Sequence, residues 1–146
     1  NDWLVFIVKQ AFGKITKVTK GRKLYDITEE VLNWVKAQRI ESGLLTLNIL
    51  HTSSSLLVNE NYDSDVLIDL ENFFSRLVRD GDKIFTHVAE GSDDMPAHIR
   101  TALTQTNLSF SVENKEISLG RWQGIFIFEH RYDEFIRTVN LHIIGE

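Results

Sequence analysis

The spacing of hydrophobic residues changes along the chain, and each change predicts an element of secondary structure. A dense apolar and β-branched run over residues 3–8 and an alternating run over 15–19 predict two strands, with Gly13 and Lys14 as the turn between them. The basic residues of the segment 14–23 alternate with Ile, Thr and Val, which is typical of the solvent face of a strand or hairpin.

A helix is expected next, starting at Thr28, where two glutamates occupy the first turn, and ending at Gly43. Residues 44–50 form a nearly continuous apolar strand that stops at His51. Residues 53–61 predict a short strand that closes in a polar turn.

The second half begins with the clearest helical pattern, which is capped by Asp63 or Ser64 and stopped by Gly81. Residues 84–88 predict a short strand that carries His87, and residues 95–103 a short helix whose start is marked by Asp93, Asp94 and Pro96. The remaining predicted strands cover residues 108–112, 117–119, 124–128 and 138–144.

Helices in the middle and strands at both ends favour an α+β sandwich over a regular βαβ repeat. We expect residues 1–146 to form a single domain with one core. The net charge of −5 argues against nucleic acid as a partner. No apolar stretch is long enough to span a bilayer and no leader opens the chain, so we expect a cytoplasmic protein without a membrane partner.

Cysteine is absent, so any metal must be bound by histidine, carboxylate and water. Taken singly, a histidine at a strand end is more often structural than a ligand. His51, His98 and His130 nevertheless come from separate elements with carboxylates nearby, and three such imidazoles suit a zinc-like centre with an open position. His142 alternates within the last strand and is interpreted as an ordinary strand residue.

Two of these histidines carry a further expectation. His98 lies in the first turn of its helix, where the helix dipole keeps the imidazole neutral and able to bind a metal. Alternation places Glu129 and His130 on opposite faces of a strand, so one of the two should leave the core side.

Four segments together closely resemble the YjbQ family of small proteins, whose members are often labelled secondary thiamine-phosphate synthases. They are H-T-S-S-S-L at 51–56, N-E-N at 59–61, E-G-S-D-D-M-P-A-H-I at 90–99 and L-G-R-W-Q-G-I-F-I-F-E-H-R at 119–131. The resemblance runs from about Asp26 to the C-terminus. The chain departs from the family pattern at Ser92, at Arg121 and at Arg22-Lys23.

The resemblance implies an α+β fold of two sheets with about three helices, assembled as a homotrimer, with the motif residues grouped in a cleft. The implied metal ligands are His51, His98 and His130, for a divalent ion such as zinc or magnesium. The implied catalytic residues are Glu90, Asp94, Gln123 and Glu129. The implied substrate-binding residues are Thr52, Asn59, Glu60 and His87, to which we add Arg121 and Arg131 as nearby cations.

The family label implies a transferase that joins a pyrimidine methyl diphosphate to a thiazole phosphate with loss of pyrophosphate. Such a reaction needs an ion on the leaving group, and the chain offers few basic residues near the motifs, so we expect weak or secondary activity. One alternative is a metal-dependent hydrolase of a small phosphorylated or acyl substrate, with Glu90 or Glu129 as the base. Another is a trimer without catalytic activity that binds a metabolite or a metal.

Overall fold

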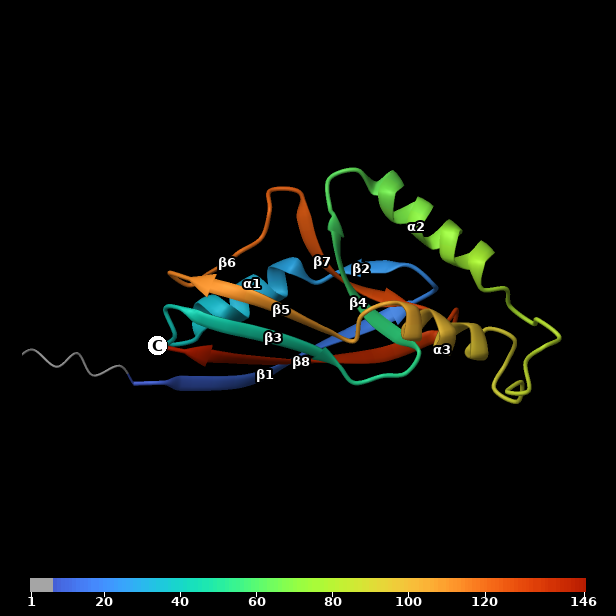
Figure 1. Ribbon diagram of the computed structural model, residues 1–146, viewed down its shortest axis with the longest axis horizontal. Coiled ribbons are helices and arrows are strands. Elements are labelled where there is room, and N and C mark those ends of the chain that lie inside the picture. Colours follow the sequence, from blue (N-terminus) through green and yellow to red (C-terminus); the bar gives the residue numbers. More distant parts are fainter. Residues whose placement is uncertain (1–6) are drawn as a thin grey trace, which may run out of the picture.

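Two antiparallel sheets and three helices make up the structure, a computed structural model that describes residues 7–146 (Figure 1). The larger sheet has the strand order β1-β8-β3-β5-β6, with bounds Lys9–Lys20, Glu134–Gly145, Gly43–Ile49, Asn107–Glu113 and Glu116–Ile117. The smaller sheet has the order β2-β7-β4, with bounds Leu24–Asp26, Gln123–Glu129 and Ser54–Glu60. The α+β two-sheet fold expected from the sequence is confirmed.

The hydrophobic core lies where the inner faces of the two sheets meet helix α1 (Thr28–Ala37). Leu45 and Leu141 come from the larger sheet and Ile127 from the smaller one, and none is more than 1% exposed. Val31 and Val35 of α1 join them, both fully buried. Burial of each such side chain contributes roughly 1.5–3 kcal/mol, which makes this cluster the main source of stability.

Strand β1 runs without a break through Gly13 and Lys14, so the turn predicted there is wrong. The glycine serves a different purpose, because a Cβ at this position would lie 2.2 Å from Nε1 of Trp34. Gly13 therefore leaves the space in which α1 packs on the sheet. Of the strand predicted over 3–8, residues 3–6 lie outside the described residues, while Ile7 and Val8 precede β1.

Helix α1 ends at Ala37 and not at Gly43 as predicted. Gly43 instead opens β3, where the backbone of β8 comes so close that a Cβ would lie 2.1 Å from the Ile144 carbonyl oxygen. The glycine marks a close approach of two strands, which in a sequence looks the same as a helix stop.

Helices α2 (Ser64–Leu77) and α3 (Asp94–Leu103) begin close to where the sequence placed them, and α2 ends at Leu77, before the predicted stop at Gly81. The Asp63 side chain caps α2 by accepting a hydrogen bond from the Asp65 amide. Figure 1 shows α2 projecting away from both sheets, and none of its residues, all of them described, is fully buried. Its anchor is the ring of Phe74, whose centroid lies 5.5 Å from that of Phe128 in β7.

The strand predicted over 84–88 is wrong, because residues 79–93 form an irregular loop between α2 and α3. The backbone bonds are local turns, such as Phe85 N to Asp82 O at 3.2 Å, since no neighbouring strand is available to pair with the segment. A bond of 3.0 Å from Gly81 N to Ser92 O joins the two ends of the loop. The helices among the described residues are all too short or too polar to cross a bilayer.

Candidate metal centre

Four side chains with atoms suited to bind a metal converge where the 79–93 loop meets the start of α3. They are His87 and Glu90 from the loop and Asp94 and His98 from the helix, and one ligand atom from each lies within 4.8 Å of all the others. Asp94 and His98 share a helix face because they are four residues apart. Gly91, with a φ of 107° that favours glycine, turns the chain from the loop toward the helix.

One oxygen of Asp94 is the focus of the group. Its Oδ2 lies 2.6 Å from Nε2 of His87 and 3.1 Å from Nε2 of His98. The carboxylate of Glu90 is more open, with Oε2 3.6 Å from the same His87 nitrogen and a side chain that is 64% exposed. Two imidazoles and two carboxylates form a donor set that suits zinc and other first-row divalent ions.

The His98 ring is oriented from behind by the backbone. Its Nδ1 lies 3.0 Å from the Thr52 carbonyl oxygen, which can only accept, so Nδ1 carries a proton and donates it there. In the neutral ring Nε2 then presents a lone pair toward the Asp94 carboxylate. Two acceptors 3.1 Å apart repel each other unless a proton or a cation lies between them. A carbonyl behind a ligating imidazole is typical of metal sites, so this arrangement fits a bound ion.

Asp94 is held in its charged form. Burial alone would raise its pKa, but the hydrogen bond from His87 and the charge of Arg131 lower the pKa to about 2. Asp93 has a lowered pKa as well, because hydrogen bonds from Arg131 and from the Tyr132 amide outweigh the effect of burial. The start of α3 therefore presents two ionised carboxylates at neutral pH.

His130 does not belong to this group, contrary to the sequence-based expectation. The ring is fully buried, its Nδ1 accepts from Nε of Arg100 at 3.0 Å, and its Nε2 lies 2.8 Å from Oγ of Ser55. Burial and the charges of Arg100, Arg22 and Arg137 lower the pKa of His130 to about 2, so the ring is neutral. Both of its nitrogens are already used in hydrogen bonds.

His51 also lies outside the group. Its Nε2 accepts a hydrogen bond of 2.8 Å from the Thr138 amide, and burial lowers its pKa. Among the residues that the structure describes, the group able to hold an ion includes His98, as expected, but neither His51 nor His130. It also includes His87, which was expected to bind the substrate. The helical spacing of Asp94 and His98 was the signal in the sequence that could have pointed to this pair.

Glu129 is not available as a general base. It is fully buried and accepts from Thr19 Oγ1, from two nitrogens of Arg137 and from the amides of residues 130 and 131. Strand alternation predicts that either Glu129 or His130 lies outside the core, and this prediction is wrong. Both are buried, because one face of β7 meets the larger sheet while Phe74 of α2 and Arg100 of α3 lie against Phe128 on the other face.

Other expected site residues lie at the far end of the smaller sheet. Ser54 pairs with Glu129 near the metal centre, whereas Glu60 pairs with Gln123 at the opposite end of β4 and β7. Seven-residue strands put these ends about 20 Å apart. Asn59, Glu60, Arg121 and Gln123 share this far end, where Gln123 accepts a hydrogen bond of 2.6 Å from the Gly120 amide. Within one chain they do not join the metal centre.

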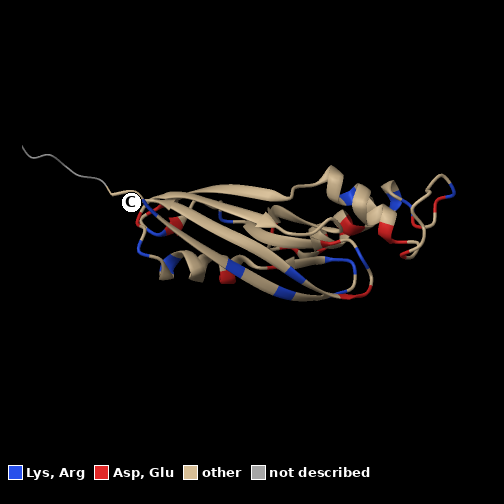
Figure 2. Ribbon diagram, turned by 90° about the horizontal axis from the view of Figure 1, so that it is seen from below, with Lys and Arg blue, Asp and Glu red and all other residues tan. Residues whose placement is uncertain are grey.

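Acidic residues gather at the end of the molecule where the loop and α3 lie, and several basic residues follow β1 (Figure 2).

The fold and the site together define an α+β protein of two sheets with a candidate His/carboxylate metal centre at one end. Residues 14–146 match the family described as UPF0047 protein YjbQ-like, and the chain belongs to this family.

The chain is 42% identical to a UPF0047 protein of Synechocystis sp., over 88% of this chain and 87% of that protein. It is 40% identical to the UPF0047 protein YjbQ of Escherichia coli O157:H7, over 90% and 96% of the two chains. A solved YbjQ-like protein of unknown function from Sulfolobus solfataricus P2 shares the fold, with a TM-score of 0.88, 21% identity, and 96% and 100% coverage. A solved YjbQ/UPF0047 protein from Clostridium acetobutylicum has a TM-score of 0.80 at 29% identity, with 89% and 98% coverage.

Proposed function

We propose that this protein is an enzyme that uses a divalent ion, held by His87, Glu90, Asp94 and His98, to act on a small phosphorylated substrate. The observation that carries the proposal is the convergence of four ligand atoms within 4.8 Å, with one imidazole oriented from behind by a carbonyl. An ion at this position would polarise a phosphoryl or carbonyl oxygen of the substrate.

The charges around the centre limit what it can bind. Glu90, Asp93 and Asp94 supply three carboxylates and Arg131 one guanidinium, a net charge of −2 that one divalent ion would neutralise. The other arginines nearby are paired within the protein, Arg22 with Asp80, Arg100 with Glu71 and Arg137 with Glu129. A diphosphate would therefore have to arrive with its own Mg²⁺.

The thiamine-phosphate synthase reaction, implied by the family resemblance, is the first reaction to assay. In it the bond from the pyrimidine methylene to the diphosphate oxygen breaks, a bond to the thiazole nitrogen forms, and pyrophosphate leaves with the electron pair. The scarcity of unpaired cations predicts slow turnover that rises with Mg²⁺ concentration, because the magnesium complex of the diphosphate is the form that the site can accept.

The test pairs metal content with activity. We expect His98→Ala to lose the ion, as measured by elemental analysis after gel filtration, and to lose synthase activity at least 100-fold with little change in thermal stability, because the side chain contributes little to the core. His142→Ala, which removes a histidine on the outer face of β8, is the matched control and should keep both properties. Activity that survives both chelation and His98→Ala would contradict the proposal.

Hydrolysis of a phosphomonoester is the second candidate, favoured by the exposed carboxylate of Glu90 beside His87. A monoester carries less charge than a diphosphate and suits a site that is neutral once an ion is bound. Zinc- or manganese-dependent turnover of a phosphomonoester panel, lost in a Glu90→Gln variant that still binds the ion, would favour hydrolysis over the synthase reaction. A tightly held ion without either activity would favour a trimer that binds a metal or metabolite and catalyses nothing.

A further inference from the structure

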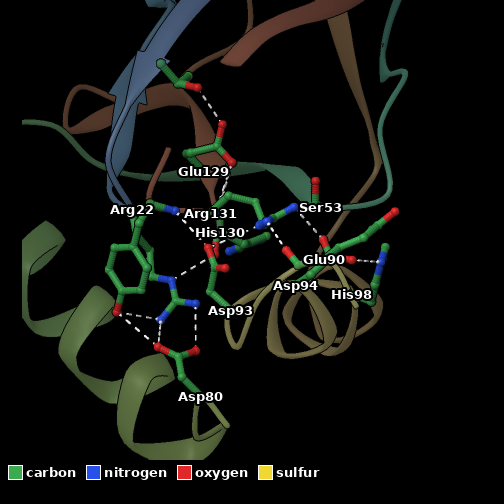
Figure 3. A network of polar contacts seen from close by, with 12 residues as sticks. Arg22, Ser53, Asp80, Glu90, Asp93, Asp94, His98, Glu129, His130 and Arg131 are labelled. Atoms are coloured by element: carbon green, nitrogen blue, oxygen red, sulfur yellow. Dashed lines mark hydrogen bonds and ion pairs between the residues drawn. The ribbon is translucent and has the colours of Figure 1, made fainter. Parts of the chain in front are cut away.

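Arg131 lies just beyond β7 and contacts both segments that supply the metal ligands. Its Nε donates to Oδ2 of Asp93 at 3.1 Å, its Nη1 to Oδ1 of Asp94 at 2.6 Å and its Nη2 to the Glu90 carbonyl oxygen at 2.9 Å (Figure 3). Only 12% of the side chain is exposed, and the guanidinium carbon lies 5.4 Å from the centroid of the Phe135 ring. Little of this arginine is left for a ligand from solvent.

The bond to Asp94 decides which way that carboxylate faces. Oδ1 is held by Arg131, and Oδ2 then points to the two imidazole nitrogens of His87 and His98. Because a carboxylate is a rigid plane, fixing one oxygen also fixes the other. Without the arginine, Asp94 could rotate about its side-chain bond and move Oδ2 away from the imidazoles.

The bond to the Glu90 carbonyl holds the loop in the same way. Glu90 is a ligand itself and His87 lies three residues before it, so this carbonyl anchors the loop segment that brings both side chains to the centre. Arg131 is itself held by Asp93, whose Oδ2 also accepts from the Tyr132 amide at 3.1 Å. One guanidinium thus links the loop, the start of α3 and the end of β7.

We propose that Arg131 is a positioning residue of the metal centre, which aims Asp94 and fixes the Glu90 segment, and that it is not a binding group for the substrate anion. This inference rests on the proposed metal centre. It assigns Arg131 a role different from the substrate-binding role expected from the sequence. If Arg131 positions the metal ligands, loss of its side chain weakens binding of the metal ion. If it binds the substrate, loss of its side chain weakens binding of the substrate anion.

The test is calorimetric titration with Zn²⁺ of the wild-type chain, Arg131→Lys, Arg131→Met and the control Arg121→Met. We expect Arg131→Met to weaken Zn²⁺ binding about 10- to 100-fold, as is typical when a partner of a metal ligand is lost. The Zn²⁺ affinity of Arg131→Lys should lie between those of the wild type and Arg131→Met, because an ammonium cannot reach three acceptors at once. Arg121, which lies over Trp122 at the far end of the sheet, should leave the Zn²⁺ affinity unchanged on substitution.

A spectroscopic readout separates positioning from a general loss of stability. The visible absorption of bound Co²⁺ reports ligand geometry, and we expect it to change in both Arg131 variants at temperatures where circular dichroism shows them folded. Asp93→Asn should weaken Zn²⁺ binding more in the wild-type background than in Arg131→Met, because part of the effect of Asp93 acts through the arginine.

The outcomes distinguish this inference from the proposed function. Wild-type Zn²⁺ affinity in both Arg131 variants would overturn the inference and leave the metal centre standing. Unchanged Zn²⁺ affinity with weaker binding of inorganic pyrophosphate to the zinc-loaded protein would also overturn it, in favour of a substrate-binding role. A wild-type chain that binds no Zn²⁺ would overturn both.

Discussion

Individual hydrogen bonds decide what the buried histidine can do. Arg100 donates to Nδ1 of His130, so the ring proton must be on Nε2, which donates to Oγ of Ser55. A serine nucleophile needs the opposite arrangement, in which the imidazole accepts the hydroxyl proton. Ser55 and His130 are also fully buried, so this pair is part of a structural network and not a catalytic dyad.

The buried His130 makes stability depend on pH. In the unfolded chain it takes up a proton near its ordinary pKa of 6.5, whereas in the folded protein the pKa is lowered to about 2, so acid favours unfolding. We expect His130 to contribute no pH dependence above about pH 6.5 and to lower the free energy of unfolding by up to about 1.4 kcal/mol per pH unit below it. Urea denaturation between pH 7.5 and 5 measures this slope.

His130→Gln should reduce that slope, since the amide can accept from Arg100 and donate to Ser55 without titrating. We expect it to cost about 1–3 kcal/mol at neutral pH through less favourable geometry. His142→Gln, on the outer face of β8, is the control and should keep the wild-type slope. Parallel curves for the wild type and His130→Gln would mean that this histidine does not set the pH dependence.

At the scale of elements, the centre joins a regular segment to an irregular one. Helix α3 fixes Asp94 and His98, and the 79–93 loop brings His87 and Glu90. The loop exposes Ile84 and Val88 to solvent, at 80% and 64%, so it gains little from apolar burial. Binding of an ion would attach the loop to the helix and so stabilise it by mass action.

A protease can measure this attachment. Lys83 is exposed in the loop, and trypsin cleaves after lysine only where the backbone can open locally. We expect saturating Zn²⁺ to slow cleavage at Lys83 at least 10-fold in the wild-type chain, followed by mass spectrometry of the fragments. His87→Ala should abolish the protection, and equal cleavage rates with and without Zn²⁺ would show that the loop does not take part in binding.

Helices and strands with regularly spaced apolar residues could be predicted from the sequence. The positions of residues in irregular loops, or on a strand that is buried on both faces, could not. The apolar spacing located α2 and the main strands, while Asp93, Asp94 and Pro96 marked the start of α3, which carries His98. Nothing in the sequence could show that the segment around His87 finds no strand to pair with. Nor could it show that both faces of β7 are covered, which is what buries His130 and Glu129 together.

At the scale of the whole molecule, two groups of apolar side chains are exposed to solvent among residues 7–146. Ile68, Phe73 and Leu77 of α2 are each at least 50% exposed, and so are Val18 and Ile136 on the larger sheet. Exposed groups of this kind are typical of surfaces that become buried on association. They fit the homotrimer that the family resemblance implies.

Light scattering after gel filtration tests that assembly. We expect a mass of three chains of 16.9 kDa each, and we expect Phe73→Asp to shift the protein toward smaller species by placing a charge on the apolar face of α2. Asp69→Asn, on the same helix, removes a charge and should keep the trimer. A wild-type protein that runs as a monomer at micromolar concentration would contradict the prediction.

The group that orients the His98 ring is the backbone carbonyl of Thr52, and this has a consequence for variation at that position. Every amino acid has the same backbone carbonyl, so a substitution at residue 52 does not remove this hydrogen bond. The bond depends on the conformation of the backbone at residue 52 and not on its side chain. This contact alone therefore does not restrict which side chain stands at position 52, and any residue there holds the imidazole in the same tautomer.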